Sequence, residues 1–149
     1  MRLALYEPDI AGNVGTLIRL GVCLGLPVDI IEPCGFAFSP RALKRSGMDY
    51  LDTADLTIHA DWAAFRVARP GRLVLLTTRA TLAYTDAAFE AGDILLTGRE
   101  SAGVPDAVHT AAGLAVRIPL QAGQRSLNVA VAAAMVAGEA LRQTGGFAA

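Results

Sequence analysis

The chain has 149 residues, of which 53% are hydrophobic and 18% are charged, and this composition excludes an intrinsically disordered protein. The length suits one compact domain over residues 1–149 with a core of its own. The formal net charge of −1 argues against a protein that binds nucleic acid through overall positive charge, although it allows a site built from a few clustered cations.

In chain order, the first half is predicted to form a strand over 3–6, a helix over 13–25 with Asn13 as its N-cap, a strand over 28–31, a short helix over 40–47, a strand over 56–59 and a helix over 61–69 capped by Asp61. The second half is predicted to form strands over 73–78, 93–98 and 114–120, and then a long helix from Ser126 to about Gly145. The runs 73–78 and 93–98 are apolar almost throughout, which is typical of strands buried on both faces of a parallel sheet. The pattern predicts an α/β domain with a mostly parallel sheet flanked by helices.

Cysteine and histidine give no sign of a metal site. Cys23 and Cys34 do not form a CxxC pair and lie in apolar stretches, so we expect two reduced core residues. His59 and His109 are far apart and belong to no nucleophile motif, so we expect neither a metal nor a catalytic role.

The ends of the expected strands carry the candidate site. Ligands of open parallel sheets bind beyond the carboxyl ends of the strands, which here lead into the loops 77–79, 98–105 and 118–128. Gly98 and Gly103 have the spacing of a P-loop, but Val104-Pro105 stands where that motif needs Lys followed by Ser or Thr. No GxGxxG follows the first strand. The remaining small and amide residues suit an adenosine with an amino-acid group, and equally suit ordinary turns and helix caps.

Three segments carry a family resemblance when they are taken together. They are PDIAGNVGTLIRL (8–20) with Asn13 and Arg19, LLTGRESAGVP (95–105) with Gly98, Glu100 and Gly103, and IPLQAGQRSLN (118–128) with Ser126 and Asn128. In order and spacing they resemble the motifs of the SPOUT (SpoU–TrmD) methyltransferases. IIEPCGF (30–36) and LKRSGMDY (43–50) are similar to segments of the TrmL, or YibK, branch of that class. The stretch Val129-Ala130-Val131 departs from the Ser-Asn pair that usually follows the third motif.

The resemblance implies a fold and an activity. The fold would be a single SPOUT domain with a deep C-terminal trefoil knot, assembled as a homodimer. The activity would be 2′-O-methylation of the ribose of the wobble nucleotide of tRNA, position 34, a cytidine or modified uridine. S-adenosyl-L-methionine would be the methyl donor and S-adenosyl-L-homocysteine the product, with no metal. The implied cofactor contacts are Leu76, Gly98, Ile118, Ser126 and Leu127.

The resemblance also implies catalytic residues. Arg19 is the first candidate, holding a phosphate and stabilising negative charge on the 2′-oxygen, because a guanidinium does not give up its proton. Asn13, Glu100 and Asn128 would orient the loops or the substrate.

A basic face is the candidate contact for the tRNA anticodon stem-loop. Arg41, Lys44 and Arg45 stand at i, i+3 and i+4 of the short helix expected over 40–47, hence on one face. The same spacing is also found on ordinary solvated helix faces.

The sequence leaves alternatives open. The chain could be a SPOUT 2′-O-methyltransferase for another tRNA or rRNA nucleotide, a catalytically weak RNA-binding relative, or a small nucleotide-binding module of another class. No apolar run reaches the ~20 residues of a membrane helix, and the start, MRLALYEPD, turns acidic too soon for a signal peptide. We therefore expect a soluble, cytoplasmic protein without a membrane partner.

Overall fold

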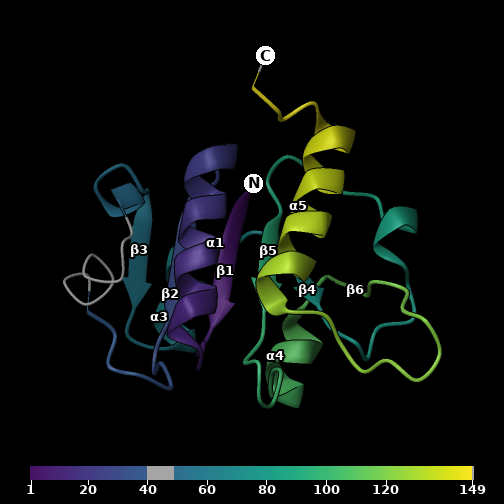
Figure 1. The fold of residues 1–149 in the computed structure, drawn as a ribbon, viewed down its shortest axis with the longest axis horizontal. Coiled ribbons are helices and arrows are strands. Elements are labelled where there is room, and N and C mark those ends of the chain that lie inside the picture. Colours follow the sequence, from purple (N-terminus) through teal and green to yellow (C-terminus); the bar gives the residue numbers. More distant parts are fainter. Residues whose placement is uncertain (40–48, 149) are drawn as a thin grey trace.

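Short parallel strands form one sheet in the computed structural model, which describes residues 1–39 and 49–148 (Figure 1). The strands are β1 (Arg2–Tyr6), β2 (Val28–Ile31), β3 (Leu56–His59), β4 (Leu73–Leu76), β5 (Ile94–Thr97) and β6 (Leu114–Val116). Their order across the sheet is β3-β2-β1-β5-β4-β6, and every neighbouring pair is parallel. All carboxyl ends therefore meet at one edge, at the bottom of Figure 1. The predicted α/β class with a parallel sheet is confirmed.

Helices cover both faces of the sheet. The longest, α1 (Ala11–Leu24) and α5 (Val129–Thr144), lie side by side on one face, over Leu5, Ile30 and Leu95. The shorter α3 (Trp62–Ala68) and α4 (Asp106–Ala111) pack on the other face, where Phe65 and Val108 join the core. Successive strand residues point to opposite faces, so the apolar runs of β4 and β5 fill both cores. Two 3₁₀ turns, η1 (Asp49–Asp52) and η2 (Tyr84–Asp86), complete the elements.

Two predicted helix starts were wrong. Helix α1 begins at Ala11 with Ile10 as its N-cap, so Asn13 lies inside the first turn. Helix α5 begins at Val129, and its cap is Asn128 rather than Ser126. The side chain of Asn128 accepts hydrogen bonds from the amides of the second and third helical residues. The side chain of Asn13 is held instead by tertiary hydrogen bonds, which are described below. The predicted cap at Asp61 is confirmed, since its carboxylate accepts from the Ala64 amide.

Other boundaries differ at the carboxyl ends of the strands. The last strand ends at Val116 instead of continuing to residue 120. The next residues leave the sheet and line a pocket, which apolar periodicity does not reveal. Helix α4 was not predicted, because six residues are too few to establish a helical period. The short helix expected over 40–47, with Arg41, Lys44 and Arg45, lies outside the described residues.

The prediction that both cysteines lie in the core was wrong for Cys23. The buried stripe of α1 runs through Val14, Leu17, Ile18 and Gly21, and Cys23 lies off this stripe and is exposed. Cys34 is half-buried, and burial, helped by nearby acidic side chains, raises the pKa of its thiol to about 11. A thiol with such a pKa is protonated at neutral pH and is no nucleophile.

A buried carboxylate joins β1, β2 and β3 to the end of α3. Asp29 of β2 is fully buried and receives the Nε atoms of Arg2 and Arg69, the latter at 3.2 Å. His59 Nε2 lies 2.7 Å from the same carboxylate. His59 is thus a buried partner of Asp29. A buried charge is tolerated only when it is paired in this way.

Removal of this carboxylate should destabilise the fold strongly. Asp29→Ala leaves the three basic side chains without their shared partner, so we expect the free energy of unfolding to fall by about 3 kcal/mol. Asp61→Ala, which removes only a helix cap, should cost about 1 kcal/mol. Denaturant unfolding at one fixed protein concentration measures both. Equal losses for the two variants would contradict this account of the core.

None of the helices in the described part of the chain is long and apolar enough to cross a membrane. The trefoil knot implied by the resemblance stays a prediction.

Candidate active site

A pocket of about 610 Å³ opens at the carboxyl ends of β4, β5 and β6. Its walls come from the segments 75–78, 98–104, 116–118 and 125–129, with Ile10 and Asn13 from the start of α1. The three loops that the sequence predicted to carry the site therefore meet around one cavity. The volume lies in the range of pockets that enclose a small ligand.

All the residues predicted to hold the cofactor line this pocket; they are Leu76, Gly98, Ile118, Ser126 and Leu127. Leu76 and Ile118 are half-buried and pack against the core, which makes them firm apolar walls. Leu127 is 40% exposed, so an apolar side chain is left at the surface beside the pocket. That these residues contact a cofactor stays a prediction.

Gly98 begins a tight loop that only glycine permits. The Arg99 amide donates to the Gly103 carbonyl at 2.9 Å, and the Gly103 amide donates back at 2.8 Å. Gly103 has a φ of +65°, the left-handed region that favours glycine. A Cβ at Gly98 would lie 2.7 Å from the carbonyl carbon of Gly103. The loop therefore folds back on itself, and at Gly98 the pocket is bordered by backbone without a side chain.

Three of the predicted catalytic residues form one chain of hydrogen bonds. The side-chain amide of Asn128 donates to Asn13 Oδ1 at 2.9 Å, and Asn13 Nδ2 donates to Glu100 Oε1 at 3.0 Å. The chain joins the start of α5, the start of α1 and the loop after β5, which are far apart in sequence. Because the Asn13 side chain is held at both ends, it is not free to cap its helix. These contacts fix the segments 8–20, 95–105 and 118–128 relative to one another around the pocket.

Asp9 extends this chain, and the sequence reasoning missed it. Its backbone amide donates to Glu100 Oε2 at 3.2 Å, and its own carboxylate accepts from the Glu100 amide at 3.0 Å. The amide and hydroxyl of Ser101 also donate to the Asp9 carboxylate. The available signal was its place shortly after the first strand, in the same edge position as the predicted loops. Asp9 and Glu100 thus bind each other reciprocally.

The Asp9 contacts predict a pH dependence of stability. Hydrogen bonding with Glu100, followed by hydrogen bonding with Ser101, lowers the pKa of the Asp9 carboxyl well below its ordinary value of 3.8. A carboxyl whose pKa is lowered by folding stabilises the fold above the unfolded pKa and loses that contribution as the pH falls below it. The pH range from about 6 to about 3 spans the ordinary pKa of an Asp carboxyl. Because Asn has no carboxylate to lose across this range, the melting temperature of Asp9→Asn should fall less than that of the wild type.

Asp106→Asn is the control for the loss of one carboxylate at the same edge, because Asp106 pairs with the exposed Arg79 outside this hydrogen-bond chain. Parallel pH profiles of Asp9→Asn and the wild type would show that Asp9 does not contribute as described.

Arg19 does not line the pocket of its own chain. Its guanidinium lies over the ring of Tyr50 in η1, 4.9 Å from the ring centre. Arg19 follows Asn13 by six residues. On an α-helix this spacing places it about 9 Å further along the axis and on a different side of the helix. Arg19 is exposed on the face of α1 away from the core. The structure therefore brings Asn13, Glu100 and Asn128 together and leaves Arg19 apart.

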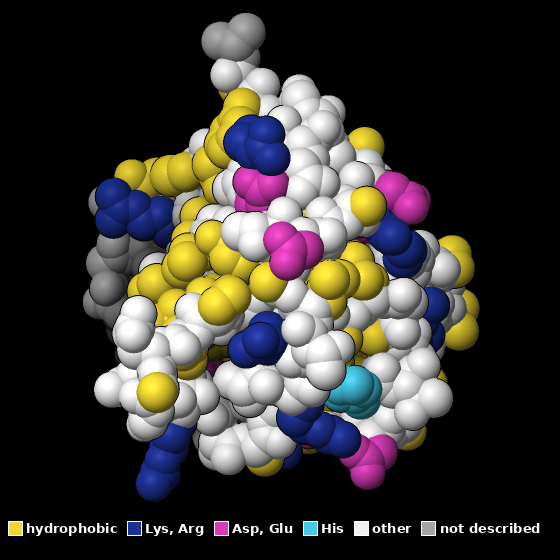
Figure 2. Space-filling model, turned by 90° about the vertical axis from the view of Figure 1, so that its right-hand side faces the viewer, with side chains coloured by type: hydrophobic (Ala, Val, Ile, Leu, Met, Phe, Trp, Pro, Cys, Tyr) yellow, Lys and Arg dark blue, Asp and Glu magenta, His cyan; other side chains and the backbone are white. Residues whose placement is uncertain are grey.

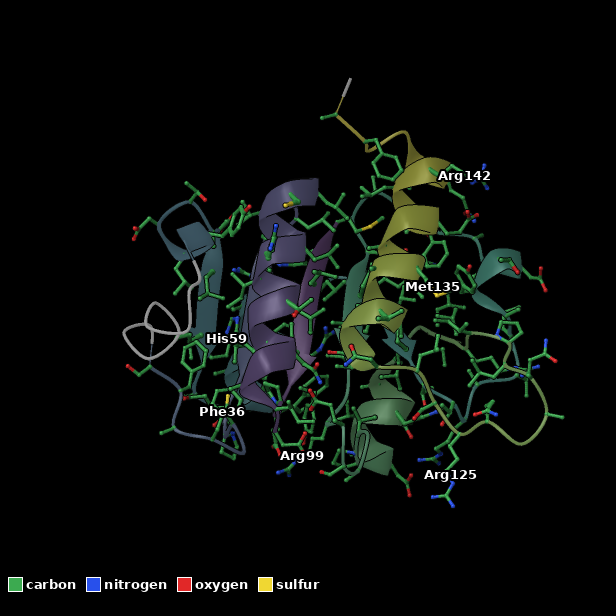
Figure 3. All side chains as sticks on the ribbon, in the orientation of Figure 1. Phe36, His59, Arg99, Arg125, Met135 and Arg142 are labelled. Atoms are coloured by element: carbon green, nitrogen blue, oxygen red, sulfur yellow. The ribbon has the colours of Figure 1, made fainter. Side chains whose placement is uncertain are left out.

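Several arginines at the pocket were not singled out from the sequence. Arg99, Arg117 and Arg125 belong to its lining, and each closely follows a strand or precedes the third motif's serine. Figure 3 shows Arg99 and Arg125 at the same end of the molecule, below the carboxyl ends of the strands. Among the described residues, no group of His, Cys, Asp and Glu has an arrangement that could hold a metal ion.

Comparison with known proteins identifies the family. A family model described as "SpoU rRNA Methylase family" matches residues 1–138. The chain belongs to this family. The SPOUT resemblance read from the three motifs is thereby confirmed, and so is the expectation of a methyltransferase.

Relatives within the SpoU family match nearly the whole chain. A protein of Ancylobacter novellus named tRNA (cytidine(34)-2'-O)-methyltransferase is 57% identical over 99% of this chain and 96% of its own length. A protein of Escherichia coli K12 with the same name is 40% identical over 97% and 94%. A solved structure described as giving structural insights into the 2-OH methylation of C/U34 on tRNA is 40% identical, covers 95% of this chain and 94% of that chain, and superposes with a TM-score of 0.88.

The structure of a more distant SpoU methyltransferase contains a bound cofactor. AviRb from Streptomyces viridochromogenes, solved in complex with the cofactor AdoMet, is 27% identical over 96% of this chain and 60% of that chain, with a TM-score of 0.80. The fold that surrounds the pocket is thus shared with a SpoU methyltransferase that binds AdoMet.

Proposed function

We propose that the chain transfers the methyl group of S-adenosylmethionine to the ribose 2′-oxygen of nucleotide 34, the wobble nucleotide, of tRNA. The observation that carries the proposal is the pocket at the carboxyl edge, where the three SpoU-family motifs meet and are joined by the hydrogen bonds of Asn13, Glu100 and Asn128. The names of relatives that match nearly the whole chain supply the substrate.

The lining of the pocket fits S-adenosylmethionine. Leu76 and Ile118 offer apolar surfaces for an adenine ring, while the backbone after Gly98 and the Ser126 hydroxyl offer polar contacts for ribose and amino-acid groups. Glu100 is the only acid among the described residues of the lining, and its carboxylate is already bound by Asn13 and the Asp9 amide. When bound, the cofactor supplies a methyl group on a sulfonium, which is an activated donor.

The protein's part in the reaction is alignment and charge stabilisation. The hydrogen-bonded Asn13, Glu100 and Asn128 hold the three motif segments so that a ribose at the pocket mouth meets the methyl donor in line. Arg19 would stabilise the negative charge that develops on the 2′-oxygen. Since it lies outside the pocket of its own chain, we propose that it serves the pocket of a second subunit.

A homodimer through α1 and α5 would bring Arg19 there. The outer side of α5 exposes Val131 and Met135, and Ile10 and Leu127 are also exposed. Hydrophobic side chains gather on the left of Figure 2, the side toward these helices. Exposed apolar groups of this kind mark contact surfaces. The proposal also includes the knot, a cytoplasmic location, and tRNA contacts by Arg41, Lys44 and Arg45.

Methyl transfer to a mixed RNA pool tests the function against its alternatives. Total RNA from a strain that lacks this activity is incubated with labelled S-adenosylmethionine, fractionated and digested to nucleosides. We expect label in tRNA, in a 2′-O-methylated nucleoside from position 34. Label in rRNA or at another tRNA nucleotide would support another SpoU-family activity instead. RNA binding without transfer would indicate the catalytically weak relative.

A further inference from the structure

The carboxyl edge of the sheet gathers arginines that the proposed mechanism does not use. Arg79 follows β4, Arg99 follows β5, and Arg117 follows β6, while Arg125 lies in the loop that leads to α5. Parallel strands place the first three positions at one edge of the sheet, and Figure 3 shows Arg125 at the same end of the molecule. Figure 2 shows several Arg side chains in the lower half of the face, toward this edge, and others in the upper half. The formal net charge of the whole chain is −1, so these arginines do not reflect an overall positive charge.

Acidic partners neutralise two of these arginines. Arg79 pairs with Asp106 at 2.9 Å, and Arg99 pairs with Glu7 at 3.1 Å. Arg99 lines the pocket, and its Nε is buried without a hydrogen-bond partner among the described residues. The positive charge of Arg99 is therefore paired, while its Nε is left as a hydrogen-bond donor without a partner.

The other two arginines keep their charge available. Arg117 donates through Nε to the Thr81 carbonyl at 3.3 Å, a contact that leaves its terminal nitrogens open. Arg125 makes no hydrogen bond or ion pair with any residue of 1–39 or 49–148. Both are exposed and line the pocket. Within the described part of the chain, the lining thus contains three arginines and one acid, Glu100, whose two oxygens accept bonds from Asn13 and the Asp9 amide.

We propose that Arg117 and Arg125 form an anion site at the pocket mouth that binds an RNA phosphate next to the ribose that is methylated. This inference rests on the proposed function. The 2′-oxygen and the 3′-phosphate sit on neighbouring carbons of one ribose, so a nucleotide whose 2′-oxygen enters the pocket brings that phosphate to its mouth. Guanidinium groups bind phosphate through paired N–H donors, which suits this position. The site is separate from the basic face at 41–45.

The carboxylate of the cofactor's amino-acid group is the other anion that an arginine at this pocket could bind. The two sources differ in what a variant changes. Removal of an arginine that binds phosphate weakens RNA binding and leaves cofactor affinity as it was. Removal of an arginine that binds the carboxylate weakens cofactor binding in the absence of RNA.

The test compares Arg125→Ala, Arg117→Ala and Arg125→Lys with Arg142→Ala. Arg142 is an exposed arginine near the other end of the molecule, paired with Glu139, and its removal changes the net charge equally (Figure 3). For each protein, titration calorimetry gives the Kd of S-adenosylmethionine, and filter binding of a tRNA transcript gives the RNA Kd at several salt concentrations. Methyl transfer gives KM and kcat.

We expect Arg125→Ala and Arg117→Ala each to weaken RNA binding about tenfold, the effect of removing one charge-assisted hydrogen bond. The slope of log Kd against log salt should flatten by about one for each phosphate that the variant no longer binds. The cofactor Kd should not change, Arg125→Lys should recover part of the RNA affinity, and Arg142→Ala should match the wild type. Unchanged RNA binding, a weakening equal to that of Arg142→Ala, or a weakened cofactor Kd would overturn the site. Failure of the proposed function looks different, because the wild type itself would then transfer no methyl group to tRNA.

Discussion

Gly98→Ala should abolish most cofactor binding and, with it, methyl transfer. The added Cβ would lie 2.7 Å from the Gly103 carbonyl carbon and 2.9 Å from its Cα, and neither backbone atom can move aside without opening the loop. Such overpacking costs about 1–3 kcal/mol, which corresponds to roughly a fivefold to 150-fold loss of affinity if the strain arises in the cofactor-bound state. Calorimetry with S-adenosylmethionine measures the affinity, and a thermal melt reports whether the variant is folded.

Gly92→Ala is the matched control for this variant. Gly92 precedes the same strand at its other end, and a Cβ there meets nothing within 4 Å. Its cofactor affinity should equal that of the wild type. If Gly98→Ala melts like the Gly92 variant and binds S-adenosylmethionine with unchanged affinity, the pocket is not the cofactor site.

Arg19→Ala should abolish transfer while leaving the pocket intact. Removal of one donor that stabilises developing negative charge costs about a hundredfold to a thousandfold in kcat. Because Arg19 does not line the pocket of its own chain, the cofactor Kd should not change. Arg19→Lys keeps the positive charge but lacks the planar guanidinium. Its kcat should therefore lie between those of Arg19→Ala and the wild type. Single-turnover kinetics with tRNA measures the effect, and an unchanged kcat in Arg19→Ala would rule out a catalytic role.

Mixed dimers show which pocket Arg19 serves. Arg19→Ala and Gly98→Ala subunits carrying different tags are co-expressed, and the heterodimer is purified through both tags. If Arg19 acts across the interface, the intact pocket of the Arg19→Ala subunit receives Arg19 from the other subunit, and activity returns. If Arg19 acts within its own chain, neither pocket is complete and the heterodimer is as inactive as its parents.

The sheet was predictable because its strands are marked in the sequence by short apolar runs. The runs at 73–78 and 93–98 are apolar at every core position, and they became strands buried on both faces. The three loops of the site were predictable for the same reason, since parallel strands place them at one edge. The ends of the strands next to the site were not predictable in this way. The strand expected to reach residue 120 ends at Val116, where the chain turns to line the pocket.

The polar residues of the site depend on contacts that spacing does not encode. Asn13 and Asn128 were both sequence candidates, but only the structure shows that they bind each other. Asn13 is held by Glu100 as well, so its local preference for a helix cap is overridden. Asp9 was missed because its partners, Glu100 and Ser101, lie more than ninety residues away. Local patterns predict elements, whereas hydrogen bonds between loops appear only once the sheet brings those loops together.

The most direct test of the account uses a pair of anticodon stem-loops that differ in one atom. One carries the ribose 2′-hydroxyl at nucleotide 34, and the other carries a 2′-deoxyribose there. Both are incubated with the wild-type protein and labelled S-adenosylmethionine, and the transferred methyl groups are counted. We expect transfer to the first RNA and none to the second, with similar binding of both. Equal transfer to the two RNAs would contradict methylation of that 2′-oxygen.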